Sequence, residues 1–254
     1  KIAEDKMKQY SIELEFRNSE LEQFAYAASH DLKEPLRKIH FYNCFIAENA
    51  ENKLDHKSQE YLSRSINAAT RMRLLIDGLL YYSRTHFNPA DYEFLDLNEV
   101  VEEIILAHRE EIEQNGICLE ADHLPVIKTI PLLFRQLMDN LISNAIKYRH
   151  PSRHSVIRIE SKVIEGAAMG EKDAEVDRMY HKIAVMDNGV GFDQQYSEKI
   201  FDIFQRLNNH PTANGSGIGL AICKKIVQGQ KGFIKAFGSP DEGSTINVYL
   251  PVNF

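Results

Sequence analysis

The stretch DNLISNAIKY, residues 139–148, decides the fold and the chemistry of the second half of this 254-residue chain. It lies in a longer apolar pattern that Pro131 opens and that predicts a helix. Asn140 and Asn144 are four residues apart, so their side-chain amides share one face of that helix. Asparagine is a poor residue for a helix interior because its side chain competes for backbone hydrogen bonds. Amide oxygens suit Mg²⁺, which takes few protein ligands, although such a pair taken alone is more often structural or solvated.

Two residues and a glycine pattern extend this candidate site. Lys147 and Tyr148 follow one turn later, where a cation can reach a phosphate and an aromatic ring can cover a base. The sequence DNGVG, residues 187–191, follows a predicted strand, and the Asp187 carboxylate can accept a hydrogen bond from an exocyclic amine. The two glycines let the backbone come close and adopt positive φ. Alone, this pattern is a weak signal, since turns after strands often have it.

A second glycine pattern, GSGIGLA at residues 215–221, leads directly into a predicted helix. Glycines before a helix N-terminus expose unpaired amides to anionic phosphates, and the helix dipole adds to the attraction. A dinucleotide fingerprint would need a strand immediately before it. The polar stretch RLNNHPTANG, residues 206–215, stands there instead and has the composition of a mobile lid. The dinucleotide interpretation is therefore disfavoured.

The order of elements after residue 92 predicts an α/β sandwich. Asn98 is expected to cap a helix that runs to about Asn115 and stops at Gly116. The polar stretch 165–180 is interpreted as a hairpin loop of no catalytic use. A further helix is expected at 215–230. Strands are expected at 93–97, 117–122, 155–164, 181–187, 232–238 and 244–251.

The first 88 residues show almost no strand signal and predict helices. Two rows of a heptad pattern run through the start of the chain: Met7, Leu14, Leu21 and Ala28, with Tyr10, Arg17 and Phe24. This favours a parallel coiled coil and a dimer, and a single amphipathic helix on a monomer is the alternative. A second helix is expected from about Ser58 to Arg84, after a polar connection, so the two helices form a hairpin. Two hairpins would make a four-helix bundle.

The first helix carries an unusual stretch, FAYAASHDLKEPLRKI, at residues 24–39. His30 and Asp31 follow the small residues Ala27 and Ala28, and Pro35 comes five residues after the histidine. Proline removes a backbone donor and clashes with the preceding turn, which predicts a bend in the helix.

Composition narrows the class of protein. The net charge of −7 gives no basic footprint for nucleic acid, and no apolar run reaches the roughly 18 residues of a membrane span. The three cysteines lack metal-ligand spacing, which favours a reducing, cytoplasmic setting. The chain begins at Lys1 without Met, so we expect a fragment of a longer protein that is itself either soluble or membrane-anchored.

Taken together, the motifs resemble a known family. DNLISNAIKY, DNGVG, IFDIFQRL, GSGIGLA and GST resemble, in order and spacing, the N, G1, F, G2 and G3 boxes of the sensor histidine kinase ATP-binding domain. The stretch at 24–39 resembles the phosphoacceptor H box of phytochrome-like kinases. The resemblance covers about Leu21 to Pro251. It implies a coiled-coil stem at 1–22, a dimerisation and phosphoacceptor hairpin at 23–88, and an ATP-binding domain at 92–254.

The resemblance also implies roles for individual residues. His30 would take the γ-phosphoryl group of ATP, and Asp31 would accept the proton of its imidazole. Asn140 and Asn144 would hold Mg²⁺ and contact ATP. The other ATP-binding residues would be Lys147, Tyr148, Asp187, Gly189, Gly191, Arg206, Gly215, Gly217, Gly219, Leu220 and Thr245, with Phe201 and Phe204 at the base of the lid.

The implied function is that of a two-component sensor kinase. The expected partners are a second copy of the chain, the receiver domain of a response regulator, and a sensor domain N-terminal to Lys1. An ATP-hydrolysing clamp of the gyrase, Hsp90 and MutL type is the alternative, but such enzymes carry a water-activating Glu where Asn140 stands here. A non-catalytic dimerisation scaffold is disfavoured by the intact motif residues. Glu34, four residues after His30, replaces the Thr or Asn that orients a water for dephosphorylation of the receiver, so phosphatase activity is in doubt.

Overall fold

The computed structural model describes residues 9, 10, 13, 16, 17, 20, 31–47, 54–83, 91–170, 174–205, 207 and 217–252. The chain divides into two compact units, Lys1–Thr85 and His86–Phe254. The predicted heptad rows fall mostly on residues outside the described ranges, as do His30, Arg206 and Gly215.

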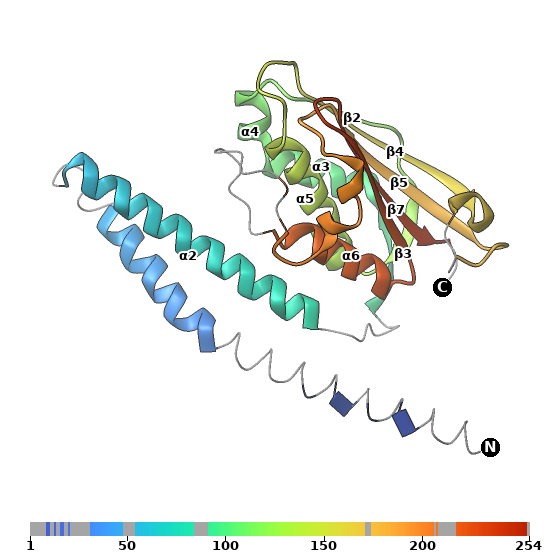
Figure 1. Ribbon diagram of the computed structural model, residues 1–254, viewed down its shortest axis with the longest axis horizontal. Helices are drawn as coiled ribbons and strands as arrows, with labels where there is room; N and C mark the ends of the chain where they lie inside the picture. The colour runs from blue at the N-terminus through green and yellow to red at the C-terminus, as the bar shows by residue number, and fades with distance from the viewer. Residues whose placement is uncertain are drawn as a thin grey trace. The chain divides into compact units, whose positions relative to one another are not determined.

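The first unit contains a pair of antiparallel helices (Figure 1). Residues 31–47 are helical throughout, Pro35 included, and α2 spans His56–Ser83. The Asn43 side-chain amide donates to Ser65 Oγ at 2.8 Å, while Leu36, nearer the start of its helix, packs with Ala69 and Ile76 farther along α2. A contact nearer the start of the first helix thus falls farther along α2. This is the pattern of an antiparallel hairpin, as the sequence predicts.

The start of α2 has a local cause. Asp55 Oδ1 accepts a hydrogen bond from the backbone N–H of Ser58 at 2.8 Å, so the aspartate caps the first turn. This bond and a second one with the Ser58 side chain lower the pKa of Asp55, because both favour the charged carboxylate. The helix therefore begins at His56, two residues before the position expected.

The second unit is a mixed α/β layer structure. Its five-stranded sheet has the order β2-β4-β5-β7-β6, and a separate two-stranded sheet pairs β1 with β3. The strands are β1 (Glu93–Asp96), β2 (Cys118–Ala121), β3 (Val126–Thr129), β4 (Val156–Glu165), β5 (Met179–Asp187), β6 (Phe233–Ser239) and β7 (Gly243–Pro251). All pairings are antiparallel except that of β2 with β4.

Helices cover one face of this sheet (Figure 1). They are α3 (Leu97–Ala107), α4 (Arg109–Gln114), α5 (Pro131–Lys147) and α6 (Gly219–Gly229), with the short 3-10 turns η2 (Gly166–Met169), η3 (Gln194–Tyr196) and η4 (Lys199–Phe201). The core between the layers contains Phe134, Leu137 and Ile142 of α5 packed toward Ile157 and Ile183 of the strands, all of them fully buried. The predicted sandwich is thus confirmed, with Pro131 as the first residue of α5.

Two local predictions need correction. The helix expected from Asn98 is capped by Asp96, whose carboxylate accepts from the Asn98 backbone N–H at 2.8 Å. The Asn98 side chain instead ties the helix start to the loop before β3, donating to the Leu124 carbonyl and accepting from the Leu124 N–H. The helix is also broken at His108, which ends α3 and precedes α4. Gly116, with φ of 58°, ends this segment as expected.

The segment expected to be a simple hairpin loop at 165–180 has a structural role. Met169 and Ala174 from this segment form a buried cluster with Tyr180 of β5 and Tyr249 of β7, against which Phe233 of β6 packs. We call residues 166–178 the β4–β5 insert. It covers part of the sheet face opposite the helices, since Tyr249 and Phe233 are paired and point away from α6.

Candidate active site

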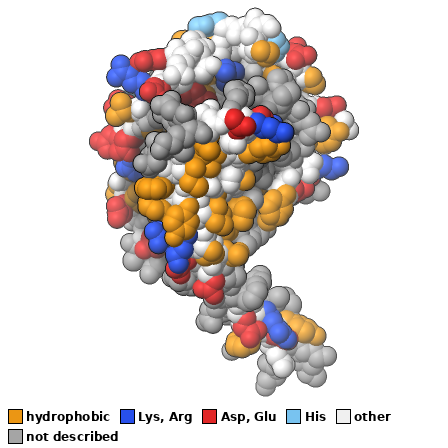
Figure 2. Space-filling model, turned by 90° about the vertical axis from the view of Figure 1, so that its left-hand side faces the viewer, with side chains coloured by type: hydrophobic (Ala, Val, Ile, Leu, Met, Phe, Trp, Pro, Cys, Tyr) orange, Lys and Arg blue, Asp and Glu red, His pale blue; other side chains and the backbone are white. Residues whose placement is uncertain are grey.

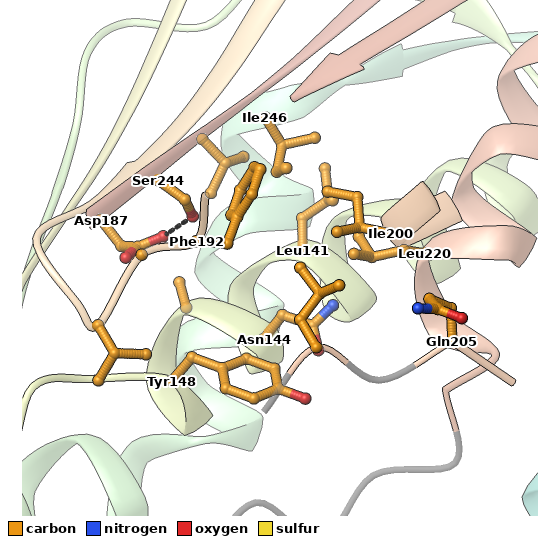
Figure 3. A pocket seen from close by; sticks show the side chains of 15 residues that line it. Leu141, Asn144, Tyr148, Asp187, Phe192, Ile200, Gln205, Leu220, Ser244 and Ile246 are labelled. Atoms are coloured by element: carbon orange, nitrogen blue, oxygen red, sulfur yellow. Dashed lines mark hydrogen bonds between the residues drawn. The ribbon is translucent and has the colours of Figure 1, made fainter. Parts of the chain in front are cut away.

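A pocket of about 120 Å³ lies between α5, the ends of β5 and β7, and the start of α6 (Figure 3). Its walls are mainly apolar, from side chains that include Leu141, Val185, Ile200, Leu220 and Ile246. The polar side chains that line it are Asn144, Tyr148, Asp187, Gln205 and Ser244. An apolar slot with a few convergent polar groups is the usual form of a small-molecule site.

Asp187 supplies the one carboxylate of this lining. It is the last residue of β5, and pairing with β7 places it opposite Ser244. Ser244 Oγ donates to Asp187 Oδ2 at 2.5 Å, and the Gly189 backbone N–H donates to Oδ1 at 2.8 Å (Figure 3). Burial raises the pKa of Asp187, and these hydrogen bonds lower it in part. Each carboxylate oxygen keeps acceptor capacity for a donor in the pocket.

The glycines after Asp187 are required by close backbone contacts. A Cβ on Gly189 would lie 2.3 Å from the Tyr148 carbonyl oxygen, and Val190 N–H donates to that same oxygen at 2.9 Å. Gly191 has φ of 60°, and a Cβ there would lie 2.0 Å from the Ser239 carbonyl oxygen. The turn is therefore pressed against both the end of α5 and the end of β6, and only glycine fits at these two positions.

One face of α5 presents the predicted polar residues. Asn144 and Tyr148 line the pocket, and Figure 3 shows both side chains beside it. Lys147 Nζ lies 3.3 Å from the Tyr148 hydroxyl and 4.7 Å from the centre of its ring. Asn140 lies one turn earlier, and a Cβ on Gly219 would come within 3.1 Å of Asn140 Oδ1. The asparagine pair therefore faces the N-terminus of α6, where a nucleotide's phosphates are expected.

The segment that leads from η4 to α6 is anchored at both ends. Phe201 is buried as expected, but the Phe204 side chain is 65% exposed, so it does not anchor the segment by packing. Instead the Phe204 backbone N–H donates to the Gly217 carbonyl oxygen at 2.9 Å. Phe204 and Gly217 both have positive φ, of 65° and 71°. Most of the lid, with Arg206 and Gly215, lies outside the described residues, and its one described residue, Leu207, lines the pocket.

The structure separates Thr245 from the pocket. Side chains alternate along a strand, and Ser244 and Ile246 line the pocket, so Thr245 points to the other face of the sheet. Ser244 is thus the hydroxyl that meets Asp187. Sequence reasoning also missed Phe192, which lines the pocket and packs so closely on β6 that a Cβ on Gly238 would lie 2.6 Å from its ring.

The helix at residues 31–47 belongs to the other unit, and His30, which precedes it in the chain, lies outside the described residues. Asp31, the first described residue of that helix, is exposed. Glu34 forms an ion pair with Lys38, in which Lys38 Nζ and Glu34 Oε1 are 2.8 Å apart. Both side chains are solvent-exposed, so the carboxylate is not buried against the hairpin.

Two features are absent from the part of the chain that the structure describes. The side chains of His, Cys, Asp and Glu form no group of three or more that could hold a metal ion there. Nor does a helix in the same ranges have the length and apolar character needed to cross a bilayer.

Family models match both units of the chain. Residues 20–86 match the His Kinase A phosphoacceptor domain. Residues 129–253 match the histidine kinase-, DNA gyrase B- and HSP90-like ATPase domain. The two matches follow the order of the motifs, with the helical hairpin first and the pocket-bearing sheet second.

Similar proteins are longer than this chain and match it over almost its whole length. The phytochrome-like protein Cph1 of Synechocystis sp. strain PCC 6803 is 34% identical over 248 residues, which are 98% of this chain and 31% of that protein. The chain thus spans about a third of the length of the curated relatives it matches.

Solved structures share the fold at low identity. The crystal structure of full-length ShkA in complex with AMPPNP matches with a TM-score of 0.67 and 17% identity, over 90% of this chain and 45% of that one. Histidine kinase ThkA in complex with the response regulator protein TrrA matches with a TM-score of 0.60 and 18% identity, over 97% of this chain and 67% of that one. With both domain models matched in order, this chain belongs to the sensor histidine kinases, of which it has the phosphoacceptor and ATPase domains.

Proposed function

We propose that the pocket of the second unit binds ATP with its adenine against Asp187, and that His30 receives the γ-phosphoryl group. The observation that carries the proposal is the carboxylate of Asp187 at the wall of an apolar slot. Its oxygens already accept hydrogen bonds from Ser244 and Gly189, which fix its orientation. A carboxylate held this way accepts a hydrogen bond from an exocyclic amine, which adenine has and guanine lacks at the corresponding position.

The residues around the slot have separate tasks. Apolar side chains such as Leu141, Leu220 and Ile246 cover the faces of the base and exclude water. Tyr148 lies at the pocket wall, and its neighbour Lys147 is placed to meet phosphate oxygens. Backbone amides at the start of α6 attract the phosphates through the helix dipole. Lys147, Gly217, Gly219, Arg206 and Gly215 keep the phosphate-binding roles expected for them, and Thr245 has none in this proposal.

Mg²⁺ fits the donors that the chain offers beside α6. Asn140 and Asn144 would hold it through their amide oxygens, and a hard cation with so few protein ligands takes the remainder from phosphates and water. When bound, the ion would neutralise charge on the transferring phosphoryl group. The asparagine at position 140 is neutral and cannot deprotonate a water, so the clamp-type hydrolysis of ATP is not favoured.

The transfer step moves one phosphoryl group. A ring nitrogen of His30 forms a bond to the γ-phosphorus, the bond from that phosphorus to the β–γ bridging oxygen breaks, and ADP leaves. Asp31 orients the imidazole and takes the proton that its other nitrogen releases. The phosphohistidine then passes its phosphoryl group to an aspartate of a response regulator. The likeness to ThkA, whose structure holds a response regulator, supports this choice of partner.

The surface of the hairpin supports a homodimer. Leu32, Ile39, Phe41 and Phe45 of the first helix are each about half exposed, as is Tyr61 of α2. Figure 2, which draws both units, shows hydrophobic side chains gathered over the middle of one face. An isolated hairpin leaves its own five exposed side chains partly in water, whereas a second hairpin would bury them in a four-helix bundle. We place the core in the cytoplasm, with a sensor domain preceding it in the full-length protein.

Labelling with γ-labelled ATP and Mg²⁺ tests the proposal. We expect one label that acid removes and base does not, as for a phosphohistidine. His30→Gln should abolish the label and leave ATP binding unchanged, since the histidine lies on the other unit. His40→Gln, ten residues later in the chain, is the matched control and should retain the label. Labelling that persists in His30→Gln would show that another residue is the phosphoacceptor.

A further inference from the structure

The outer edge of strand β6 offers unpaired backbone groups. β6 is the last strand of the five-stranded sheet, and its other edge pairs with β7. Gln194 bonds to this outer edge, donating to the Ala236 carbonyl at 3.3 Å and accepting from the Gly238 N–H at 3.0 Å. Because backbone direction alternates along a strand, the N–H and C=O of Ile234 and the N–H of Ala236 point the same way. No hydrogen-bond partner for these three groups occurs among the described residues.

A groove follows this edge. It has a volume of about 720 Å³ and is lined by every residue from Gly232 to Phe237. One wall is the side of α6, with Lys224 and Gln228, and continues to Lys231 just beyond the helix. The other wall is the β4–β5 insert, with Glu175 and Arg178. A groove of this size, with a strand edge for its floor, fits a short extended peptide.

The two walls differ in charge. Lys224, Gln228 and Lys231 are spaced four and three residues apart and so form one row that faces the groove. Lys224 and Lys231 have no acidic partner among the described residues, whereas Arg178 on the opposite wall pairs with Glu175 at 3.0 Å. Glu198 is the other acidic residue among the described residues of the lining. These two lysines give this wall a positive charge, although the chain as a whole has a net charge of −7.

The other face of the edge is apolar. Phe233 and Phe237 point away from α6, and Phe237 is 47% exposed. A strand added beside β6 would direct alternate side chains to these two faces. One set would meet the lysine row of α6, and the other set would meet the phenylalanines. The strand edge thus favours an extended backbone in a bound segment, and the two faces favour alternating acidic and apolar side chains.

We propose that the free edge of β6 binds an extended segment of a partner protein in which acidic and apolar residues alternate. The segment adds a strand through the backbone groups of Ile234 and Ala236. Its acidic side chains pair with Lys224 and Lys231, and its apolar side chains cover Phe237. This binding site is separate from the nucleotide pocket, since none of the described residues lines both.

A model peptide tests the proposal with the full chain. The probe is a fluorescein-labelled peptide of alternating Glu and Val, and fluorescence anisotropy measures its binding. A peptide of the same charge with Pro at alternate positions cannot form a strand. We expect the first peptide to bind and the second to bind at least tenfold more weakly. Amide hydrogen exchange at Ile234 and Ala236 should slow only with the first peptide.

Two double variants distinguish binding in the groove from attraction by the overall charge of the protein. Lys224→Glu with Lys231→Glu should weaken binding of the Glu–Val peptide at least tenfold, because the lysine row becomes acidic. Lys128→Glu with Lys162→Glu makes the same change of charge at exposed positions outside the groove and should bind the peptide as the parent does. The proposal would be overturned if both double variants lost the same peptide affinity, or if the proline peptide bound as tightly as the Glu–Val peptide. It would also be overturned if the Glu–Val peptide did not bind, or if it left exchange at Ile234 and Ala236 unchanged. Circular dichroism confirms that each variant is folded.

Discussion

Asp187→Asn removes a single charge from the pocket and leaves its shape almost unchanged. The parent carboxylate accepts from Gly189 N–H on one oxygen and from Ser244 Oγ on the other. In the variant, the amide oxygen can keep the Gly189 bond while the amide nitrogen donates to Ser244, whose hydroxyl rotates to accept. The fold therefore retains its local hydrogen bonds. The adenine amine, however, now faces a donor where it had an acceptor.

The size of the effect follows from the bond that is lost. A hydrogen bond to a charged group contributes about 1.5–3 kcal/mol. Each 1.4 kcal/mol corresponds to about a tenfold change in affinity, so ATP should bind roughly 10-fold to 150-fold more weakly. The free energy of unfolding should be equal or higher, because burial raises the pKa of Asp187 and the neutral amide avoids that cost.

Isothermal titration with ATP, together with thermal unfolding, measures both quantities. Asp193→Asn is the matched control. Asp193 lies in the same segment and caps η3 by accepting from Gln195 N–H at 3.0 Å, but it does not line the nucleotide pocket. We expect its ATP affinity to stay within about twofold of the parent value. If folded Asp187→Asn bound ATP as tightly as the parent, the adenine would not lie against Asp187.

Three further predictions concern pH, a glycine and Glu34. Because burial raises the pKa of Asp187, its protonation should weaken ATP binding as pH falls, and titrations from pH 8 to pH 5 should show this dependence in the parent but not in Asp187→Asn. The same raised pKa makes the parent lose stability relative to Asp187→Asn as pH rises from about 4 through the folded-state pKa, which denaturant unfolding at several pH values can check. Gly191→Ala should lower the free energy of unfolding by about 1–3 kcal/mol, since a Cβ meets the Ser239 carbonyl and φ is 60°. Gly170→Ala is the control: its φ is 65° but the space around the Cβ is open, so the free energy of unfolding should fall by less. The parent should release phosphate slowly from a phosphorylated receiver with ADP present, because the Glu34 carboxylate repels the anionic aspartyl phosphate. Glu34→Asn should accelerate this release. Rapid release by the parent that is unchanged in Glu34→Ala would show that this position does not control the reaction.

Much of the second unit could be predicted from the sequence, because its signals are local. The helix from Pro131 and the turn after Asp187 each follow from residues close together in the chain. Ser244 and Thr245 could not be distinguished in this way. Which of two neighbouring hydroxyls faces the pocket depends on the register of β7 against β5, and a shift of one residue would exchange them.

Other features escaped prediction because their causes are tertiary. Strand β3 has only four residues between two prolines, and its pairing with β1 defines it. The choice of Asp96 over Asn98 as helix cap depends on the loop before β3, because Leu124 in that loop takes two of the hydrogen bonds of the Asn98 side chain. The role of the β4–β5 insert depends on Tyr249, a residue about 80 positions from Met169 that the sheet brings beside it.

The bond between Phe204 N–H and the Gly217 carbonyl has an evolutionary consequence. It joins the two ends of the segment that precedes α6 and so holds them together whatever lies between them. A change in the number of residues between the two ends leaves the start of α6 where it is. Doubling the length of a closed loop costs only about 0.6 kcal/mol in chain entropy. Insertions and deletions can therefore accumulate between the two ends at little energetic cost, while Phe204 and Gly217 keep the start of α6 in place.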